Sequence, residues 1–225
     1  MRFAGFQKTS LIDYPDRVAS VLFSAGCNLR CPYCHNGDLV EGYTGPFHEE
    51  VEIIEILLSR KRYIDSVVVS GGEPTMDPGL PAFLEKLREL GFNVKLDTNG
   101  LKPDALRECL PYLSYVAMDV KTSIENYPSL GTGDTSQISE SIKIIMESGL
   151  DYEFRCTAVP GIVELESVRK MGEMVRGAEI FVFQQYKPEK TLDPTYNDII
   201  PHTEEQIREF AAIMENYVEK VLLRV

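Results

Sequence analysis

Residues 18–34 read VASVLFSAGCNLRCPYC, and this stretch decides how the rest of the chain is interpreted. The apolar run Val18–Phe23 is short and ends at small residues, which predicts a buried β-strand. Three cysteines follow it within eight residues. Active sites of βα folds lie at the carboxyl ends of their strands. The cysteine loop is therefore expected at a functional edge of a sheet.

From residue 18 onward, short apolar runs alternate with segments of helical periodicity. Gly91 and Gly149 follow two of the predicted helices as C-caps, and Thr203 and Gln206 have capping-box spacing. The predicted strands are Val18–Phe23, Val67–Val69, Asn93–Leu96, Tyr115–Val120, Tyr152–Val159 and Ile180–Gln184. The predicted helices are His48–Arg62, Leu80–Leu90, Asp104–Leu110, Ser136–Ser148, Glu164–Val175 and Thr203–Tyr217. Residues 218–225 form either a final strand or an apolar tail.

These elements make about six strand–helix units, which predicts right-handed crossovers and a parallel sheet. Six units are fewer than a closed (β/α)8 barrel needs. The expected fold class is α/β, a partial open (β/α)6 barrel with mostly parallel strands; a flat doubly wound sheet is the second choice. We expect one domain over residues 1–225. It comprises an N-terminal extension (1–17) at the barrel bottom, a barrel core (18–185) and a C-terminal loop and helix (186–225).

The composition is that of a globular protein, with 23 basic and 35 acidic residues in a chain of 225. The formal net charge of −12 and the lack of a dense Lys/Arg cluster argue against nucleic acid as the main partner. No apolar run approaches the ~18 residues of a membrane span. The N-terminus lacks the apolar segment of a signal peptide. We therefore expect a cytoplasmic enzyme with no membrane partner.

The cysteine spacing is C-x3-C-x2-C, formed by Cys27, Cys31 and Cys34. Three thiolates can bind three irons of a [4Fe–4S] cube and leave the fourth iron open for catalysis. A structural zinc site is the alternative, but it needs a fourth ligand, and the adjacent His35 is poorly placed to supply one. The other two cysteines, expected to be buried structural thiols, are Cys109 and Cys156.

Polar segments follow the later predicted strands. Gly71-Gly72-Glu73-Pro74 ends the second, Asp97-Thr98-Asn99-Gly100 the third and Asp119-Val120-Lys121 the fourth, while Arg155 lies in the fifth. Charged residues in apolar strands are costly unless they are paired or functional. Each could form a salt bridge at the barrel mouth, but together they favour a polar site. The glycines would let backbone approach a ligand, and Glu73 could accept a hydrogen bond from an ammonium group.

The cysteine motif, with its aromatic residue Tyr33 before the last cysteine, resembles the signature of the radical S-adenosylmethionine (SAM) superfamily. The segment Gly71–Pro74 resembles the superfamily's GGEP segment, and the resemblance spans essentially the whole chain. It implies a [4Fe–4S] cluster whose open iron chelates the methionine part of SAM. The reduced cluster then cleaves SAM to a 5′-deoxyadenosyl radical. The protein would supply orientation and seclusion.

Residues 27–36, preceded by the segment Phe6–Pro15, resemble more narrowly the glycyl-radical-enzyme activating enzymes. The likeness is greatest to the activating proteins of anaerobic ribonucleoside-triphosphate reductase. It implies an oxidoreductase that abstracts a Cα hydrogen from one glycine of a partner enzyme, with anaerobic ribonucleotide reductase as the expected partner. Flavodoxin or ferredoxin would be the reductant. The ferredoxin-like insert with extra cysteines that some activators carry has no counterpart in this sequence.

The resemblance also implies roles for the other polar residues. Asp97 and Asp119 would help to bind a monovalent cation beside the SAM carboxylate, and Lys121 and Arg155 would contact SAM. The expected catalytic residues are Cys27, Cys31, Cys34 and Lys121, with the three cysteines as metal ligands. The expected cofactor-binding residues are Tyr33, Gly71, Gly72, Glu73, Asp97, Asp119, Lys121 and Arg155.

Two other functions stay open. The first is a radical SAM enzyme acting on a small molecule, similar to 7-carboxy-7-deazaguanine synthase, because those enzymes are also short open barrels. The second is an iron–sulfur electron carrier without catalysis. A carrier would favour a fourth cysteine ligand and needs no SAM pocket, so the segment Gly71–Pro74 argues against it.

Overall fold

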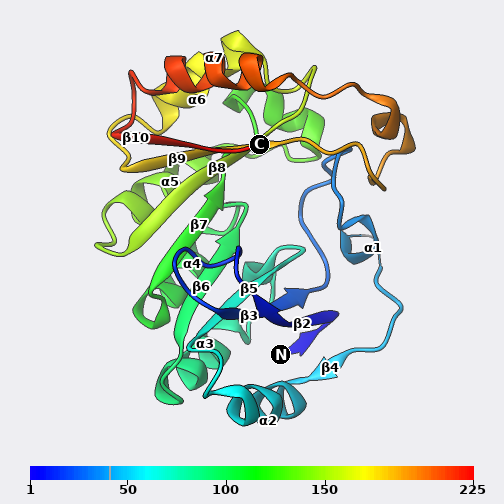
Figure 1. The fold of residues 1–225 in the computed structure, drawn as a ribbon, viewed down its shortest axis with the longest axis vertical. Coiled ribbons are helices and arrows are strands. Elements are labelled where there is room, and N and C mark those ends of the chain that lie inside the picture. The colour runs from blue at the N-terminus through cyan, green and yellow to red at the C-terminus, as the bar shows by residue number, and fades with distance from the viewer. Residues whose placement is uncertain (41) are drawn as a thin grey trace.

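The computed structural model describes residues 1–40 and 42–225, and its centre is an eight-stranded sheet (Figure 1). Seven neighbouring strands run parallel, while the edge strand β2 is antiparallel to β3. In spatial order the strands are β10 (Lys220–Arg224), β9 (Ile180–Gln185), β8 (Asp151–Ala158), β7 (Tyr115–Asp119), β6 (Asn93–Thr98), β5 (Ser66–Gly71), β3 (Ala19–Ser24) and β2 (Gly5–Ser10). A separate antiparallel pair joins β1 (Arg2–Phe3) and β4 (His48–Glu49).

The sheet curves, and helices cover its outer side (Figure 1). Because β2 and β10 are its two edges, the barrel is open, which confirms the predicted fold class and excludes the flat doubly wound alternative. The apolar tail also proves to be a strand, β10. The helices are α1 (Gly37–Val40), α2 (Glu50–Arg60), α3 (Leu80–Glu89), α4 (Pro103–Cys109), α5 (Ser136–Met146), α6 (Leu165–Met174) and α7 (Glu204–Met214). Only α1 was not expected from the sequence.

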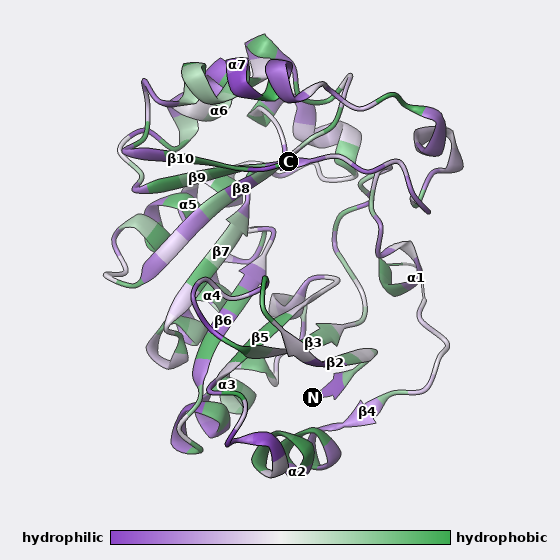
Figure 2. Ribbon diagram, in the orientation of Figure 1, coloured by the Kyte–Doolittle hydropathy of each residue, from purple (hydrophilic) through white to green (hydrophobic). Residues whose placement is uncertain are grey.

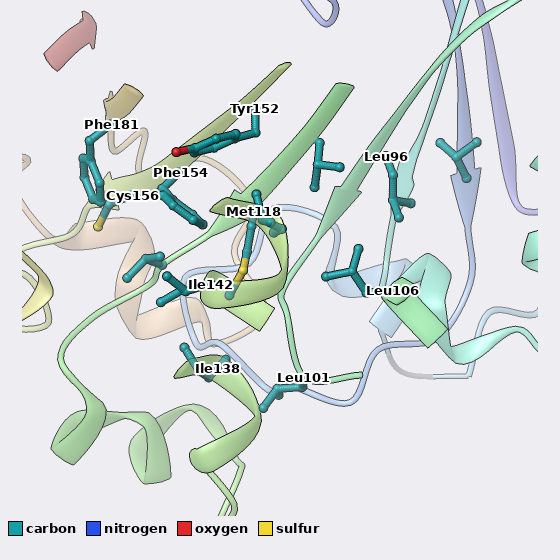
Figure 3. Packing of buried hydrophobic residues seen from close by; sticks show 14 of the residues in the cluster. Leu96, Leu101, Leu106, Met118, Ile138, Ile142, Tyr152, Phe154, Cys156 and Phe181 are labelled. Carbon is teal, nitrogen blue, oxygen red and sulfur yellow. The ribbon is translucent and has the colours of Figure 1, made fainter. Parts of the chain in front are cut away.

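The main core lies between the sheet and the helices. The longer helices turn one apolar stripe inward at a 3.6-residue period, as Ile138 and Ile142 of α5 do. These side chains pack in one cluster with Met118 of β7 and Phe154 of β8, all fully or almost fully buried (Figure 3). Burial of this apolar surface is the dominant favourable term in folding. It fixes the helices and therefore the loops that follow each strand.

A smaller cluster fills the amino-terminal end of the barrel on the inner side of the sheet. Tyr14, from the segment before β3, packs against Tyr115 at the start of β7, with ring centroids 5.7 Å apart. Val21 and Val68 belong to the same buried cluster. The first 17 residues thus supply the edge strand β2 and cover the bottom of the barrel. The carboxyl ends of the strands remain accessible.

Above this cluster the inner face carries charge. Figure 2 shows hydrophilic segments that interrupt the apolar strands β6 and β8. They correspond to Lys95 and Asp97 on β6 and to Glu153 and Arg155 on β8, each pair two residues apart and thus on the same face of its strand. Within residues 1–40 and 42–225, no helix has the length and apolar character needed to cross a membrane.

Candidate active site

A cavity of about 240 Å³ opens at the carboxyl ends of the parallel strands. It gathers residues from five strand ends and from the cysteine loop, as expected for a βα fold. The residues predicted from the sequence that line it are Cys27, Cys31, Tyr33, Cys34, Gly71, Gly72, Asp97, Asp119, Lys121 and Arg155. Glu73 is the one predicted residue that does not.

The three clustered cysteines are free thiols that line this cavity together. Two donors approach the sulfur of Cys27: the backbone N–H of Leu29 at 3.4 Å and the amide Nδ2 of Asn99 at 3.7 Å. Among the described residues, no three Cys, His, Asp or Glu side chains converge as ligands of one metal ion do. An iron–sulfur cube needs three thiolates that each bind a different iron, whereas a structural zinc ion needs four ligands.

Burial acts on the protonation of the thiols in the metal-free chain. Burial raises the pKa of Cys31 to about 11 and also raises that of Cys27. Metal binding deprotonates a coordinating thiol, so iron would hold these groups as thiolates. His35 is engaged elsewhere: its Nε2 lies 2.6 Å from the carbonyl oxygen of Lys187, and its ring stacks on Tyr186.

The irregular segment after β9 anchors the cysteine loop, although it lies about 160 residues further along the chain. The backbone N–H of Leu192 donates to the carbonyl of Cys34 at 2.9 Å, and that of Asp193 donates to the carbonyl of Pro32 at 2.8 Å. Figure 1 shows this segment beside α1, which follows the cysteines. The C-terminal loop predicted after the barrel core thus holds the cysteine loop through backbone hydrogen bonds.

Gly71 and Gly72 bring the loop after β5 against the loop after β3. Gly71 has a φ of +107°, and a Cβ atom on Gly72 would lie 1.9 Å from the carbonyl oxygen of Gly26. The N–H of Gly72 donates to the carbonyl of Ser24 at 2.9 Å. Glycine is needed here because backbone approaches backbone, in addition to any approach to a ligand.

Glu73, which the sequence predicts to bind SAM, lies at the junction between the loops after β5 and β6. Its side chain is buried and does not line the cavity, and it is held by donors from the turn after β5 and from the end of β6. It accepts hydrogen bonds from the N–H and hydroxyl of Thr75 at 3.1 and 2.5 Å, the hydroxyl of Thr98 at 2.8 Å and the N–H of Asn99 at 2.6 Å. Burial raises the pKa of Glu73, and these hydrogen bonds oppose the shift. In this structure the carboxylate braces the loop after β6.

The other charged residues form one connected network. Arg155 links the two aspartates, at 3.4 Å from Asp97 and 3.0 Å from Asp119, and Lys121 lies 3.2 Å from Asp119. Burial acts to raise the pKa of Asp119, but the charges of Lys121 and Arg155 outweigh it and hold that pKa at about 2. Burial likewise opposes ionisation of Asp97, and Arg155 and Lys95 lower its pKa. The mouth of the barrel therefore holds ionised groups of both signs.

Sequence reasoning missed several residues of the site. Lys95 is buried beneath the cavity and pairs with Asp97 at 2.5 Å. A lysine two residues before Asp97 on an otherwise apolar strand was the signal that could have found it. Ser70 donates to Asp97 at 2.9 Å, while Thr157 and Gln184 line the cavity from neighbouring positions on β8 and β9. No sequence pattern pointed to these three.

The remaining two cysteines are buried, as the sequence predicts. Cys109 and Cys156 are buried and lie outside the cavity lining. Burial raises the pKa of Cys109 to about 12, so this thiol is protonated and unreactive. The prediction that both are buried is confirmed.

Comparison with known proteins identifies the family. The family model of the radical SAM superfamily matches residues 21–175, which is more than half of the chain. A protein of Methanocaldococcus jannaschii, provisionally named a glycyl-radical enzyme activating enzyme, is 30% identical over 98% of this chain and 95% of its own length. The pyruvate formate-lyase-activating enzyme of Clostridium pasteurianum is 28% identical, with 78% of this chain and 76% of that protein covered.

A relative with a different activity is about as similar in sequence to this chain as the pyruvate formate-lyase-activating enzyme is. The 7-carboxy-7-deazaguanine synthase of Thermococcus kodakarensis is 27% identical, with 73% of this chain and 72% of that protein covered. The solved structure of SuiB from Streptococcus suis, bound to the precursor peptide SuiA, has the same fold, with a TM-score of 0.70 at 15% identity. That likeness covers 91% of this chain and 48% of SuiB. The chain therefore belongs to the radical SAM superfamily, and its cofactors are a [4Fe–4S] cluster and SAM.

Proposed function

We propose that this radical SAM enzyme is an activase that installs a glycyl radical on a partner enzyme. The observation that carries the proposal is the likeness to a provisionally named activator, which extends over 98% of the chain and 95% of that relative. The second relative, an activator of pyruvate formate-lyase, supports the same reaction class. The resemblance of segment Phe6–Pro15 favours an anaerobic ribonucleotide reductase as the partner, with flavodoxin or ferredoxin as reductant.

In this proposal the chain's own residues bind and orient the cofactors. Cys27, Cys31 and Cys34 hold three irons of the cluster. Arg155 and Lys121 line the cavity as cationic donors, and they suit the carboxylate of SAM through charge-assisted hydrogen bonds. When bound, the cluster and SAM supply a 5′-deoxyadenosyl radical that removes a hydrogen atom from the glycine Cα.

The shape of the barrel suits a protein substrate. Because β2 and β10 do not close the sheet, a loop of another protein can enter the cavity from the side without being threaded through a ring. Thr157 and Gln184 lie beside each other on β8 and β9 and offer polar groups toward such a loop. A bound loop would place its Cα–H next to the reacting group and turn an encounter into a unimolecular step.

The second candidate is a radical SAM enzyme that acts on a small heterocycle. It is favoured by the likeness to the synthase from Thermococcus kodakarensis, whose identity is close to that of the pyruvate formate-lyase activator. The two candidates share the cluster, SAM and the fold. They differ only in what enters the cavity.

The test is electron paramagnetic resonance on the reconstituted enzyme mixed anaerobically with reductant, SAM and a candidate glycyl-radical protein. We expect the doublet of a glycyl radical on the partner. The Cys31→Ala variant should give no doublet, whereas Cys109→Ala, which removes a buried thiol outside the cavity, should retain it. Turnover of a small heterocycle with no doublet from the partner protein would contradict the proposal.

A further inference from the structure

The inner face of the barrel carries seven connected charged side chains. They form a chain of ion pairs that extends from the cavity to the last strand, where Arg224 binds both oxygens of Glu153 at 3.0 and 2.7 Å. The four basic members are Lys95, Lys121, Arg155 and Arg224, and the three acidic members are Asp97, Asp119 and Glu153. The group therefore has one more positive than negative charge.

The resemblance to the activating enzymes implied a monovalent cation between Asp97 and Asp119, and the donor set does not fit one. Lys95 occupies Oδ1 of Asp97, while Ser70 and Arg155 approach Oδ2. The two oxygens of Asp119 face Arg155 and Lys121. All four carboxylate oxygens, the atoms that would coordinate a hard cation, already face cationic donors.

Two of these donors, Arg155 and Lys121, line the cavity, whereas Lys95 does not. Its side chain is 1% exposed and lies below the cavity, with its ammonium 5.9 Å from the centre of the Tyr115 ring. It pairs with Asp97 from the side opposite to the ligand. A ligand that enters the cavity therefore leaves the Lys95–Asp97 pair in place.

We propose that Lys95 is a positioning residue that takes the place of a monovalent cation, so that this enzyme binds SAM without sodium or potassium. The ammonium of a lysine supplies the same single positive charge at the same carboxylate. Adding an alkali cation would bring a further positive charge beside two carboxylates whose oxygens already face cationic donors. The inference rests on SAM binding alone and does not depend on which substrate the enzyme activates.

The test measures SAM affinity of the reconstituted enzyme by anaerobic equilibrium dialysis. Buffers contain potassium, sodium or choline chloride at equal ionic strength, because choline is too large to enter the site. For the wild type we expect the dissociation constant of SAM to change by less than about twofold between buffers. Losing one charge-assisted contact would weaken SAM binding roughly tenfold or more. A tenfold weakening in choline would overturn the proposal.

The Lys95→Met variant keeps an unbranched side chain that is one atom shorter and removes the charge. We expect it to bind SAM roughly tenfold or more weakly in choline and to recover in potassium or sodium. The control Lys86→Met, which removes an exposed lysine paired with Glu50, should behave as the wild type. A folded Lys95→Met variant that is indifferent to the cation would overturn the role of Lys95.

A second measurement on the wild type guards against a variant that does not fold. Sodium-23 relaxation, recorded with SAM bound, should show no saturable sodium site. A saturable site that Asp97→Asn abolishes would overturn the proposal. None of these measurements requires a partner protein, so failure here is distinguishable from failure of the activase proposal.

Discussion

Replacing Glu73 by alanine is the sharpest test of how the site is held together. The carboxylate satisfies four buried donors, two of which are backbone N–H groups, those of Thr75 and Asn99. The two hydroxyls can turn to other acceptors, but the N–H groups cannot. A buried donor left unsatisfied costs about 1–3 kcal/mol, so Glu73→Ala should lower the free energy of unfolding by roughly 3–5 kcal/mol.

The loss should also reach the cluster. Glu73 holds Asn99 through its backbone N–H. The side-chain amide of Asn99 donates to the side chain of Asn28 at 2.7 Å and lies beside the sulfur of Cys27. Released from Glu73, this loop would no longer hold the Cys27 side of the cavity, so iron content after reconstitution should fall together with stability. Glu73→Gln, which keeps one acceptor oxygen, should lose about half as much, or ~2 kcal/mol.

The assay combines anaerobic urea unfolding of the cluster-free protein with iron analysis after reconstitution. The control is Glu89→Ala, at an exposed position at the end of α3, which should change the free energy of unfolding by less than about 0.5 kcal/mol. Suppose Glu73→Ala keeps wild-type stability and iron content while SAM affinity alone falls. Glu73 would then contact SAM, as its sequence context suggested, and the bracing role would be wrong.

Three further predictions concern the charged network. Arg155→Ala should weaken SAM binding by roughly 10- to 150-fold by equilibrium dialysis while iron content stays near that of the wild type; unchanged affinity would remove Arg155 from the SAM pocket. Arg224→Ala removes the bidentate partner of the buried Glu153 carboxylate and should lower the free energy of unfolding in urea by ~2–3 kcal/mol. A loss below about 0.5 kcal/mol would show that the pair is not stabilising. Because the pKa of Asp119 is lowered from 3.8 to about 2, its stabilising contribution is present above pH 3.8 and is lost as the pH falls through about 2. Asp119→Asn should therefore flatten the pH dependence of unfolding of the cluster-free protein in that window, and an unaltered slope would contradict the pairing.

Much of the fold could be predicted because its signals are local. Short apolar runs predicted the strands and helical periodicity predicted the helices. The number of strand–helix units, about six, predicted an open barrel. Gly91 and Gly149, both with positive φ, follow α3 and α5, and Thr203 and Gln206 form the expected capping box. Helix α1 was missed because four residues carry too little periodicity to detect.

The residues of the site could be predicted only where they belong to a recognisable sequence motif. The cysteine spacing and the polar strand ends identified the residues that line the cavity, but a motif does not say which way a side chain points. Glu73 turns inward to the loop after β6 because the buried N–H of Asn99 needs an acceptor there. Lys95 and Gln184 reach the site through sheet register, and the anchoring of Cys34 by Leu192 depends on contacts between distant segments.

The most direct test of the account follows the hydrogen atom. A candidate glycyl-radical protein, prepared with deuterium at its glycine Cα positions, is mixed anaerobically with the reduced enzyme and SAM, and the 5′-deoxyadenosine formed is examined by mass spectrometry. The account predicts that deuterium appears in 5′-deoxyadenosine and that the partner accelerates SAM cleavage. If no candidate partner transfers label or accelerates cleavage, while a deuterated small heterocycle does both, the activase function is contradicted and the small-molecule reaction is supported.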